Sequence, residues 1–183
     1  MYKKINKFLS IVFKPSIIYK YFFNISPLYI RTTGNIKYVS EDVYKIIVEI
    51  PLSYKNRNYA GTMFGGSILS ATDPIYMLQL IHILGSEYII WDKSVSAEYI
   101  KPINQKAIAI FEFQREEIEQ IKESVKKNNE ITLNKKLHIT NKLGNVFCYM
   151  EKIIYIADKN YYKEKVRNKN ITIHKVKDTV SIL

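Results

Sequence analysis

A run of twenty residues from Gly65 to Leu84 is apolar on nearly every face of a helix, and it constrains the fold more than any other segment. The run reads GGSILSATDPIYMLQLIHIL, and Gly85 after it can adopt the left-handed conformation that ends a helix. A helix that is apolar all round must be surrounded by protein or by lipid. Asp73 lies near its middle, and a central aspartate costs about 2.5 to 3.5 kcal/mol on insertion into a bilayer. We therefore expect this helix to be buried inside the fold.

Segments with strand character lie on both sides of the expected helix. Polar and apolar residues alternate within them, and Ser40-Glu41-Asp42 and Asn141 to Gly144 supply turns. Residues 116–127 begin with Glu, end with Lys and carry one apolar stripe, which predicts a short surface helix. This order predicts an α+β fold, in which an antiparallel sheet wraps around a long central helix. The expected strands are residues 33–39, 43–51, 88–101, 106–115, 131–141 and 145–156.

The chain is long enough for one domain with extensions at both ends. Its 183 residues are 47% hydrophobic, which suffices for a continuous core. We assign residues 31–157 to this domain. Residues 1–30 are expected to form a helical segment that packs on it, with short helices in 2–24 that either cap the domain or lie on a membrane surface, the cap being favoured. Residues 158–183 form a basic tail.

The formal net charge of +11 is concentrated at the two ends. Residues 1–31 contain six Lys or Arg and no acid, whereas residues 157–183 contain seven bases and three acids. The central 125 residues therefore carry a net charge of only about +1. We expect no specific nucleic-acid partner, and at most a weak contact of the basic ends with a membrane surface.

Cysteine usage predicts a reducing, cytoplasmic compartment. The single cysteine, Cys148, cannot form an internal disulfide and has no neighbours at the spacing of a thiolate zinc site. The N-terminus carries lysines and an apolar run, but Pro15 interrupts the run and no small-residue cleavage site follows. We expect no metal and no cofactor.

Asp73 is the one charged residue between Arg57 and Glu87. A carboxylate in an apolar helix must be hydrogen bonded, paired or partly hydrated. Gly65 and Gly66 at the helix start would let a substrate approach unsatisfied amides that can stabilise an oxyanion, and Asp73 could serve as a base for water. Alternatively, the glycines only permit close helix packing and Asp73 is a structural acid.

The spacing of these residues resembles a known thioesterase pattern. Asn58, Gly61, Gly65-Gly66 and Asp73 match the Asn, Gly, His-Gly-Gly and Asp of hotdog acyl-CoA thioesterases of the phenylacetate-pathway type. The runs GTMFGGSILSATDPIYMLQL and LGSEYIIWDKSVSAEYIKP are similar to an uncharacterised bacterial hotdog family, described as a domain of unknown function and grouped with thioesterases. The similarity covers about residues 25–157, and the motif histidine is replaced by Phe64.

The resemblance implies roles for individual residues. Gly66, with Gly65 beside it, would offer the oxyanion amide, Asp73 would act as general base or nucleophile, and Asn58 would hold the loop or a water molecule. It also implies a homodimer or a tetramer of dimers with the site between two subunits, for which the strand around Trp91 is a candidate seam. Substrate-binding candidates are Asn58, Gly61, Thr62, Phe64 and Ser70.

Two functions fit these residues: hydrolysis of an acyl-CoA or another acyl thioester, and non-catalytic binding of an acyl chain or lipid in an apolar pocket closed by Phe64. Other reactive side chains are weaker candidates. We expect His82 to be a core histidine, His138 to lie on the polar face of a strand and Cys148 to serve packing. Asp92 and Lys93 form either a buried ion pair or ordinary edge charges.

Overall fold

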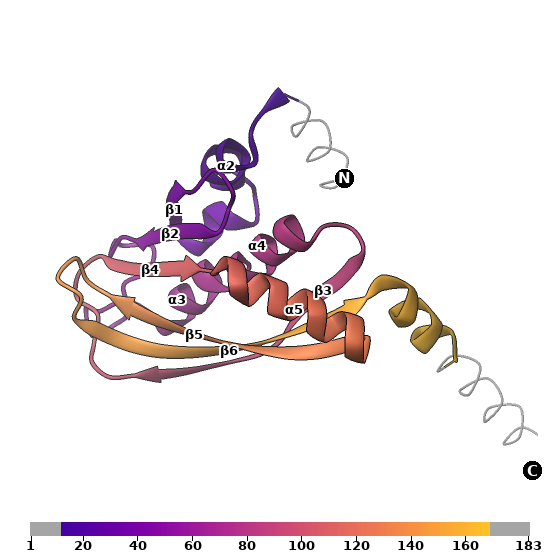
Figure 1. Ribbon diagram of the computed structural model, residues 1–183. Coiled ribbons are helices and arrows are strands. Elements are labelled where there is room, and N and C mark those ends of the chain that lie inside the picture. Colours follow the sequence, from indigo (N-terminus) through magenta and orange to yellow (C-terminus); the bar gives the residue numbers. More distant parts are fainter. Residues whose placement is uncertain (1–11, 169–183) are drawn as a thin grey trace, which may run out of the picture.

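In the computed structural model, which describes residues 12–168, six strands form one antiparallel sheet in the order β1-β2-β4-β5-β6-β3. Two consecutive helices lie along one face of the sheet, where the sequence predicts a helix (Figure 1). The expected helical residues 2–11 and the tail residues 169–183 lie outside the described part of the chain. The elements are α2 (Pro15–Ile17), η1 (Ile18–Phe23), η2 (Tyr29–Thr32), β1 (Asn35–Val39), β2 (Lys45–Ile50), α3 (Gly65–Thr72), α4 (Ile75–Leu84), β3 (Tyr88–Tyr99), β4 (Ala107–Glu112), α5 (Arg115–Asn128), β5 (Glu130–Thr140) and β6 (Val146–Asp158).

The expected single helix of residues 65–84 is two helices, α3 and α4, separated at Asp73 and Pro74. Proline lacks the amide that would continue the helical ladder, so the chain bends there. Gly85 ends α4 with a positive φ of 84°, but its ψ of −165° makes the backbone extended rather than left-handed helical. The expectation that the helix is enclosed on every side is wrong, because the Asp73 side chain is exposed and Ile81 is 44% exposed.

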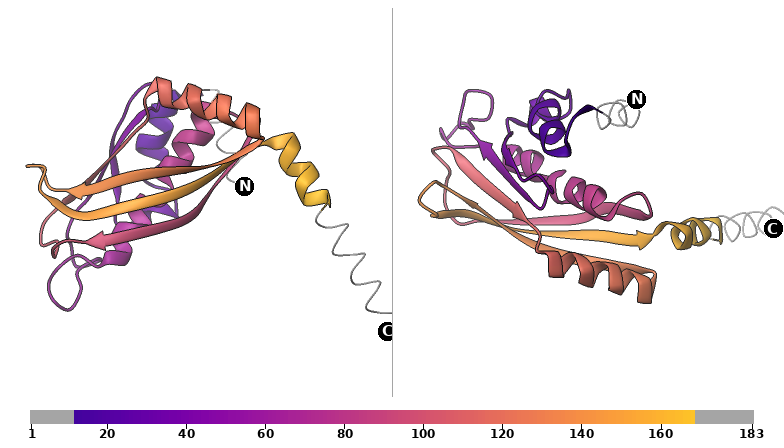
Figure 2. Two further views of the ribbon diagram at one scale, coloured as in Figure 1. Left: turned by 60° about the horizontal axis from the view of Figure 1, so that its bottom comes forward. Right: turned by 45° about the horizontal axis from the view of Figure 1, so that its top comes forward.

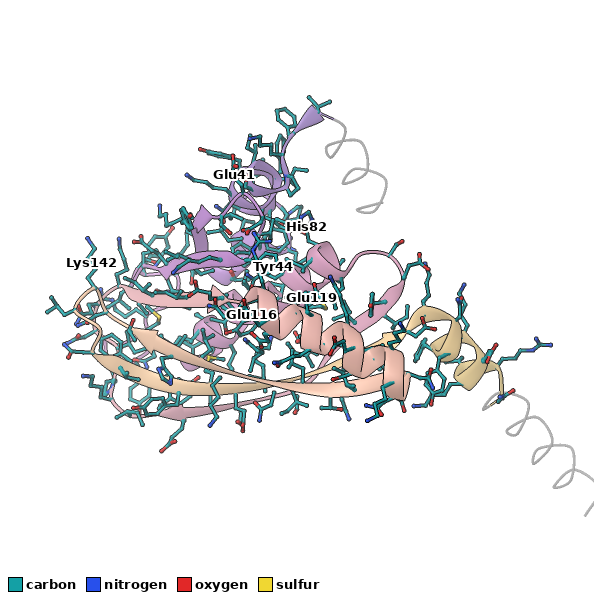
Figure 3. The ribbon with its side chains drawn as sticks, viewed as in Figure 1. Glu41, Tyr44, His82, Glu116, Glu119 and Lys142 are labelled. Atoms are coloured by element: carbon teal, nitrogen blue, oxygen red, sulfur yellow. The ribbon has the colours of Figure 1, made fainter. Side chains whose placement is uncertain are left out.

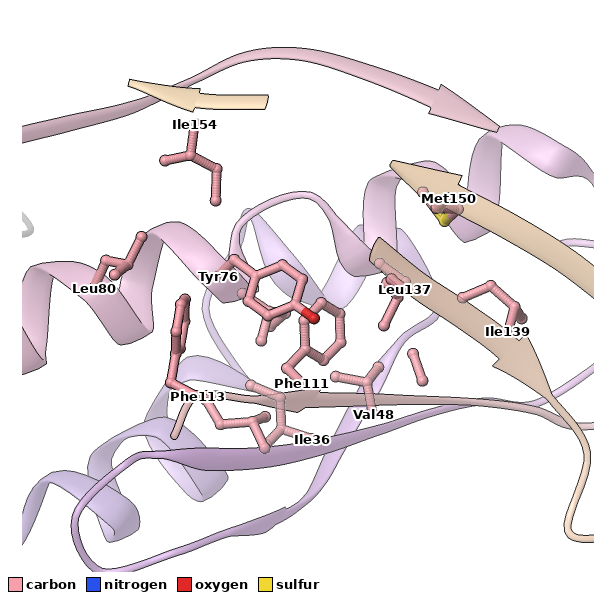
Figure 4. Close-up of a cluster of buried hydrophobic side chains, with 14 of the residues drawn as sticks. Ile36, Val48, Tyr76, Leu80, Phe111, Phe113, Leu137, Ile139, Met150 and Ile154 are labelled. Atoms are coloured by element: carbon pink, nitrogen blue, oxygen red, sulfur yellow. The ribbon is translucent and has the colours of Figure 1, made fainter. Parts of the chain in front are cut away.

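One continuous core joins the helices to the sheet (Figure 4). Alternate residues of the strands point toward α3 and α4, as shown by Ile46, Val48 and Ile50 on β2. At the centre, the Phe111 ring of β4 meets the Tyr76 ring of α4 edge to face, with centroids 4.8 Å apart. Phe111 is fully buried, so this pair fixes α4 against the sheet.

The buried Gln79 explains one polar interruption of the apolar run. Its side-chain amide donates to the backbone oxygens of Val43 (2.9 Å) and Tyr44 (3.0 Å) in the turn between β1 and β2. Val43 has a φ of 62°, which is rare for a β-branched residue. Gln79 therefore connects α4 to a turn whose conformation needs support.

The N-terminal segment of residues 12–32 covers the side of α3 and α4 that faces away from the sheet (Figure 2). The Tyr29 hydroxyl donates to the carbonyl of Ala71 in α3 at 3.0 Å, and both residues are buried. The Tyr19 ring contacts His82 of α4 edge to face, with centroids 6.1 Å apart. His82 is thus not the core histidine that the sequence predicted; it is exposed beside this segment, where Figure 3 labels it.

Strand β3 forms one edge of the sheet and pairs only with β6. Its register shifts between Asp92 and Ser94, which marks a β-bulge at Lys93. On the face away from α3 and α4, Trp91 stacks on Tyr155 with centroids 4.1 Å apart, and Tyr162 from the helical residues 159–168 packs against both rings. The Trp91 ring is therefore covered by its own chain, whereas the backbone edge of β3 has no partner strand within the described residues.

Candidate functional site

Asp73 occupies the bend between α3 and α4, where its carboxylate reaches the surface. The side chain is 64% exposed and lines an open groove of about 520 Å³. One wall comes from the N-terminal segment and the other from the two helices. The volume falls in the range typical of small-molecule sites. The groove is lined by Leu28, Tyr29, Arg31, Thr32, Leu69, Ser70, Asp73 and Pro74.

A buried lysine, Lys152 of β6, lies directly beneath Asp73. Its ammonium donates to the backbone carbonyl of Asp73, and it lies 3.6 Å from the Asp73 carboxylate. It also donates to Oδ2 of Asp92 at 2.9 Å. The Lys152 side chain is only 1% exposed. The expectation that Asp73 must be paired or partly hydrated thus holds on both counts.

Asp92 of β3 points toward this lysine, because it pairs with Ile154 and so lies on the helix-facing side of the sheet. The Asp92 side chain is 17% exposed, and its Oδ1 is a buried oxygen without a hydrogen bond. Burial raises the pKa of Asp92, while the hydrogen bond and charge of Lys152 act in the opposite direction. Of the two alternatives for Asp92 and Lys93, Asp92 is in a largely buried ion pair, but its partner is Lys152, and Lys93 is exposed.

The start of α3 is covered by two aromatic side chains. A Cβ added to Gly66 would overlap the Phe64 ring, and one added to Gly65 would lie 2.6 Å from the Tyr99 hydroxyl oxygen. Both glycines therefore provide room for close packing, which is the structural alternative raised by the sequence. Their amides, as the first of the helix, donate to no acceptor within residues 12–168, so they also remain available as donors.

The loop before α3 is organised by Asn58. Its side-chain oxygen accepts from the amides of Ala60 (3.0 Å) and Thr62 (3.1 Å), and its amide group donates to the Thr62 hydroxyl at 3.0 Å. Gly61 has a φ of 78°, which a side chain would disfavour. Asn58, Gly61 and Thr62 therefore form one tight turn.

Asn56 was missed by the sequence reasoning and is almost fully buried, at 3% exposure. Its side chain accepts from the Ser53 amide at 2.8 Å and donates to the Pro51 carbonyl at 2.9 Å and the Thr33 hydroxyl at 3.0 Å. Its own carbonyl accepts from the amide of Phe64 at 2.8 Å. Asn56 thus ties the loop to the residue that precedes α3.

Replacing Asn56 with alanine is expected to destabilise the protein by about 2 to 4 kcal/mol, because three hydrogen bonds of a buried side chain are lost together. Urea denaturation followed by tryptophan fluorescence measures the change. The matched control is the exposed Asn104, for which alanine should change stability by less than about 0.5 kcal/mol. Equal stability of the two variants would contradict this role of Asn56.

The structure does not bring all the candidates together within one chain. Ser70 shares the groove with Asp73, although its hydroxyl donates to the Gly66 carbonyl at 2.8 Å. The amide of Gly66 lies seven residues before Asp73 on the same helix, which is about 10 Å along the axis at 1.5 Å per residue. The backbone positions of the two groups are therefore about two helical turns apart on one chain.

The other reactive side chains lie elsewhere. His138 is exposed on the sheet and contacts the Tyr149 ring. Cys148 is buried, as expected, and burial raises the pKa of its thiol to about 11, so it is not a thiolate at neutral pH. Among residues 12–168, no three His, Cys, Asp or Glu side chains are grouped as a metal site would require. No helix in this range combines the length and hydropathy needed to cross a bilayer.

Comparison with known sequences gives one family match. The model of a family described as a domain of unknown function, DUF4442, matches residues 16–156. No curated protein matches the chain.

Several solved structures share the fold. A Pseudomonas aeruginosa protein of unknown function, described as a probable thioesterase, has a TM-score of 0.62 at 13% identity, over 70% of this chain and 85% of that one. A Chlorobaculum tepidum protein of unknown function has a TM-score of 0.61 at 17% identity, over 86% and 94% of the chains. A Haemophilus influenzae thioesterase has a TM-score of 0.54 at 14% identity, over 74% and 86%. At these identities the likeness shows the fold alone, which is the hotdog fold.

Proposed function

The chain belongs to the family described as a domain of unknown function, DUF4442, and from this premise we propose that it hydrolyses an acyl thioester such as an acyl-CoA. The observation that carries the proposal is the Asp73 carboxylate, which stands in a groove above a buried ammonium. Thioesterase descriptions among the solved structures with the same fold support the reaction class.

The proposed reaction uses a base and an oxyanion site. The Asp73 carboxylate takes a proton from a water molecule, whose oxygen attacks the thioester carbon. The developing negative charge on the carbonyl oxygen is stabilised by the free amides of Gly65 and Gly66. The C–S bond then breaks, the proton passes to the thiolate, and the products are a carboxylic acid and a thiol. Asn58 shapes the loop that leads into these amides.

The distance between Gly66 and Asp73 favours a site that is shared by two copies of the chain. Both groups lie beside β3: Asp73 through Lys152 near Asp92, and Gly65 against Tyr99, the last residue of the strand. If two β3 edges pair antiparallel about a two-fold axis midway between Asp92 and Tyr99, Asp92 of one copy lies opposite Tyr99 of the other. We therefore propose a homodimer in which Asp73 of one copy serves the Gly65-Gly66 amides of the second.

Spacing of the motif residues supports a relationship to the phenylacetate-type thioesterases, with Phe64 in place of the motif histidine. The Phe64 ring lies against Gly66 and is 58% exposed, so it would cover the oxyanion amides until it moves aside for a substrate. This same ring favours the second candidate function, a non-catalytic acyl binder. The buried single cysteine fits the reducing cytoplasm that we propose as the location.

Thiol release from acyl-CoA substrates of different chain lengths, followed with a thiol reagent, tests the proposal. We expect turnover above the uncatalysed rate for at least one chain length, and a particle of twice 21.5 kDa by sedimentation velocity. Copurification of an acyl ligand without turnover at any chain length would favour the binder. A monomer with full activity would contradict the shared site.

A further inference from the structure

We infer that Lys152 is the positioning residue that holds Asp73 at the helix bend, an inference that deepens the proposed function and rests on it for its kinetic consequence. Lys152 is a single cation among apolar neighbours on the inner face of β6, between Met150 and Ile154. An uncompensated ammonium in such a place would cost several kcal/mol. An apolar side chain at this position would avoid the free-energy cost of burying a charge, yet the residue is a lysine.

The partners of the ammonium explain its position. At the bend, the Asp73 carbonyl accepts from Lys152 rather than from a helical amide. The second donor goes to Asp92, and the remaining side of the ammonium faces the Asp73 carboxylate at 3.6 Å. Two of the three N–H donors of the ammonium are thus hydrogen bonded, while the Asp73 carboxylate is attracted by the charge across 3.6 Å. One side chain therefore binds the backbone of Asp73 and attracts its carboxylate.

Asp92 acts as the anchor of Lys152. It is carried by β3, while Lys152 is carried by β6, so the ion pair crosses two neighbouring strands below the bend. Asp92 faces the helices because it pairs with the buried Ile154 on the same side of the sheet, just before the register shift at Lys93. The two carboxylates share one cation, which leaves a net charge of −1 on the cluster, and the more exposed carboxylate, Asp73, is the one that faces the groove.

Lys152 cannot itself touch a substrate, because its side chain is 1% exposed beneath Asp73. Its effect must therefore pass through the orientation of Asp73. A displacement of about 1 Å in a reacting group can lower a rate by up to about 100-fold. We expect Lys152→Met, which keeps most of the apolar stem of the side chain and removes the ammonium, to lower kcat for an acyl-CoA by about 10- to 100-fold with KM changed less than about threefold.

The matched control is Lys136→Met on the adjacent strand β5, where the lysine is exposed. This variant should keep the kcat and KM of the unmodified protein. A Lys152→Met variant that folds and also keeps both values would overturn the inference. A fall in kcat that is equal in the two variants would overturn it as well.

Two NMR measurements test the inference independently of thioester turnover. In the unmodified protein, the ¹⁵N resonance of the Lys152 ammonium should show slow proton exchange and a coupling across the hydrogen bond to the Asp73 carbonyl. In the Asp92→Asn variant, which retains the cation but removes the negative charge that anchors it, the ¹³C resonance of the Asp73 carboxylate should move from its position in the unmodified protein. A freely exchanging Lys152 ammonium, or an unmoved Asp73 resonance, would overturn the inference. Absence of thioester turnover with both signals as expected would instead count against the proposed function alone.

Discussion

Replacing Asp73 with asparagine is expected to lower the rate of acyl-CoA hydrolysis by about 100- to 10,000-fold, the contribution typical of a general base. Asparagine preserves the shape of the side chain and can still lie near Lys152, but it cannot accept a proton from water. Because the side chain is 64% exposed, the substitution should leave the free energy of unfolding nearly unchanged. Steady-state kinetics and urea denaturation of the same preparation separate the two effects.

The exposed carboxylate of Glu123 on α5 provides the control, since Glu123→Gln should keep full activity.

A site shared by two subunits also predicts that two inactive variants restore activity when they form a mixed dimer. Co-expression of Asp73→Asn with Gly66→Val, followed by purification through two different tags, yields a dimer with one doubly defective and one intact site. Its activity should return to about half that of the unmodified dimer if the site is shared by two copies. Undiminished turnover by Asp73→Asn would remove the residue from the mechanism.

Replacing Phe111 with alanine is expected to lower the free energy of unfolding by about 3 to 5 kcal/mol. Phe111 has no exposed surface and packs against Tyr76 of α4, so the substitution removes a large buried ring and opens a cavity between helix and sheet. Chemical denaturation gives the change from the midpoint and slope. Since α3 and α4 carry Asp73 and both glycines, activity should be lost at a lower denaturant concentration as well.

Ile110 provides a matched control on the same strand. It precedes Phe111, points to the opposite face of the sheet and is 46% exposed. Ile110→Ala should therefore cost less than about 1 kcal/mol. Similar losses for the two alanine variants would contradict the assignment of the helix-facing side of the sheet as the core.

Most of the fold could be predicted because the spacing of apolar residues along the chain indicates which side chains are buried. The apolar run ending at Gly85 predicts the long helix, and the alternation within the strand segments predicts six strands, all of which the structure contains. Two features of the helix were predicted incompletely. Pro74 divides it into α3 and α4, and the groove on its outer side leaves Asp73 exposed, because the N-terminal segment covers only part of that side.

Less of the candidate site could be predicted from the sequence, because the residues that contact Asp73 and Gly65 come from distant segments of the chain. Lys152 lies 79 residues after Asp73, and only its place in the alternation of Cys148, Met150 and Ile154 marks it as a charge on a buried face. From the local sequence, Asp92 and Lys93 could form a buried ion pair or be ordinary edge charges, whereas Asp92 is paired with Lys152 of the neighbouring strand. Nothing near Gly65 in the sequence indicates that Tyr99 packs against it.

A crystal structure with a non-hydrolysable acyl-CoA analogue tests the central claim most directly. The account predicts that the oxygen standing for the thioester carbonyl accepts hydrogen bonds from the Gly65 and Gly66 amides of one copy, with the Phe64 ring moved aside. It also predicts that the Asp73 carboxylate of a second copy lies within one water molecule of the adjacent carbon. An analogue bound away from both glycines, or an Asp73 that remains remote from it in every copy, would contradict the account.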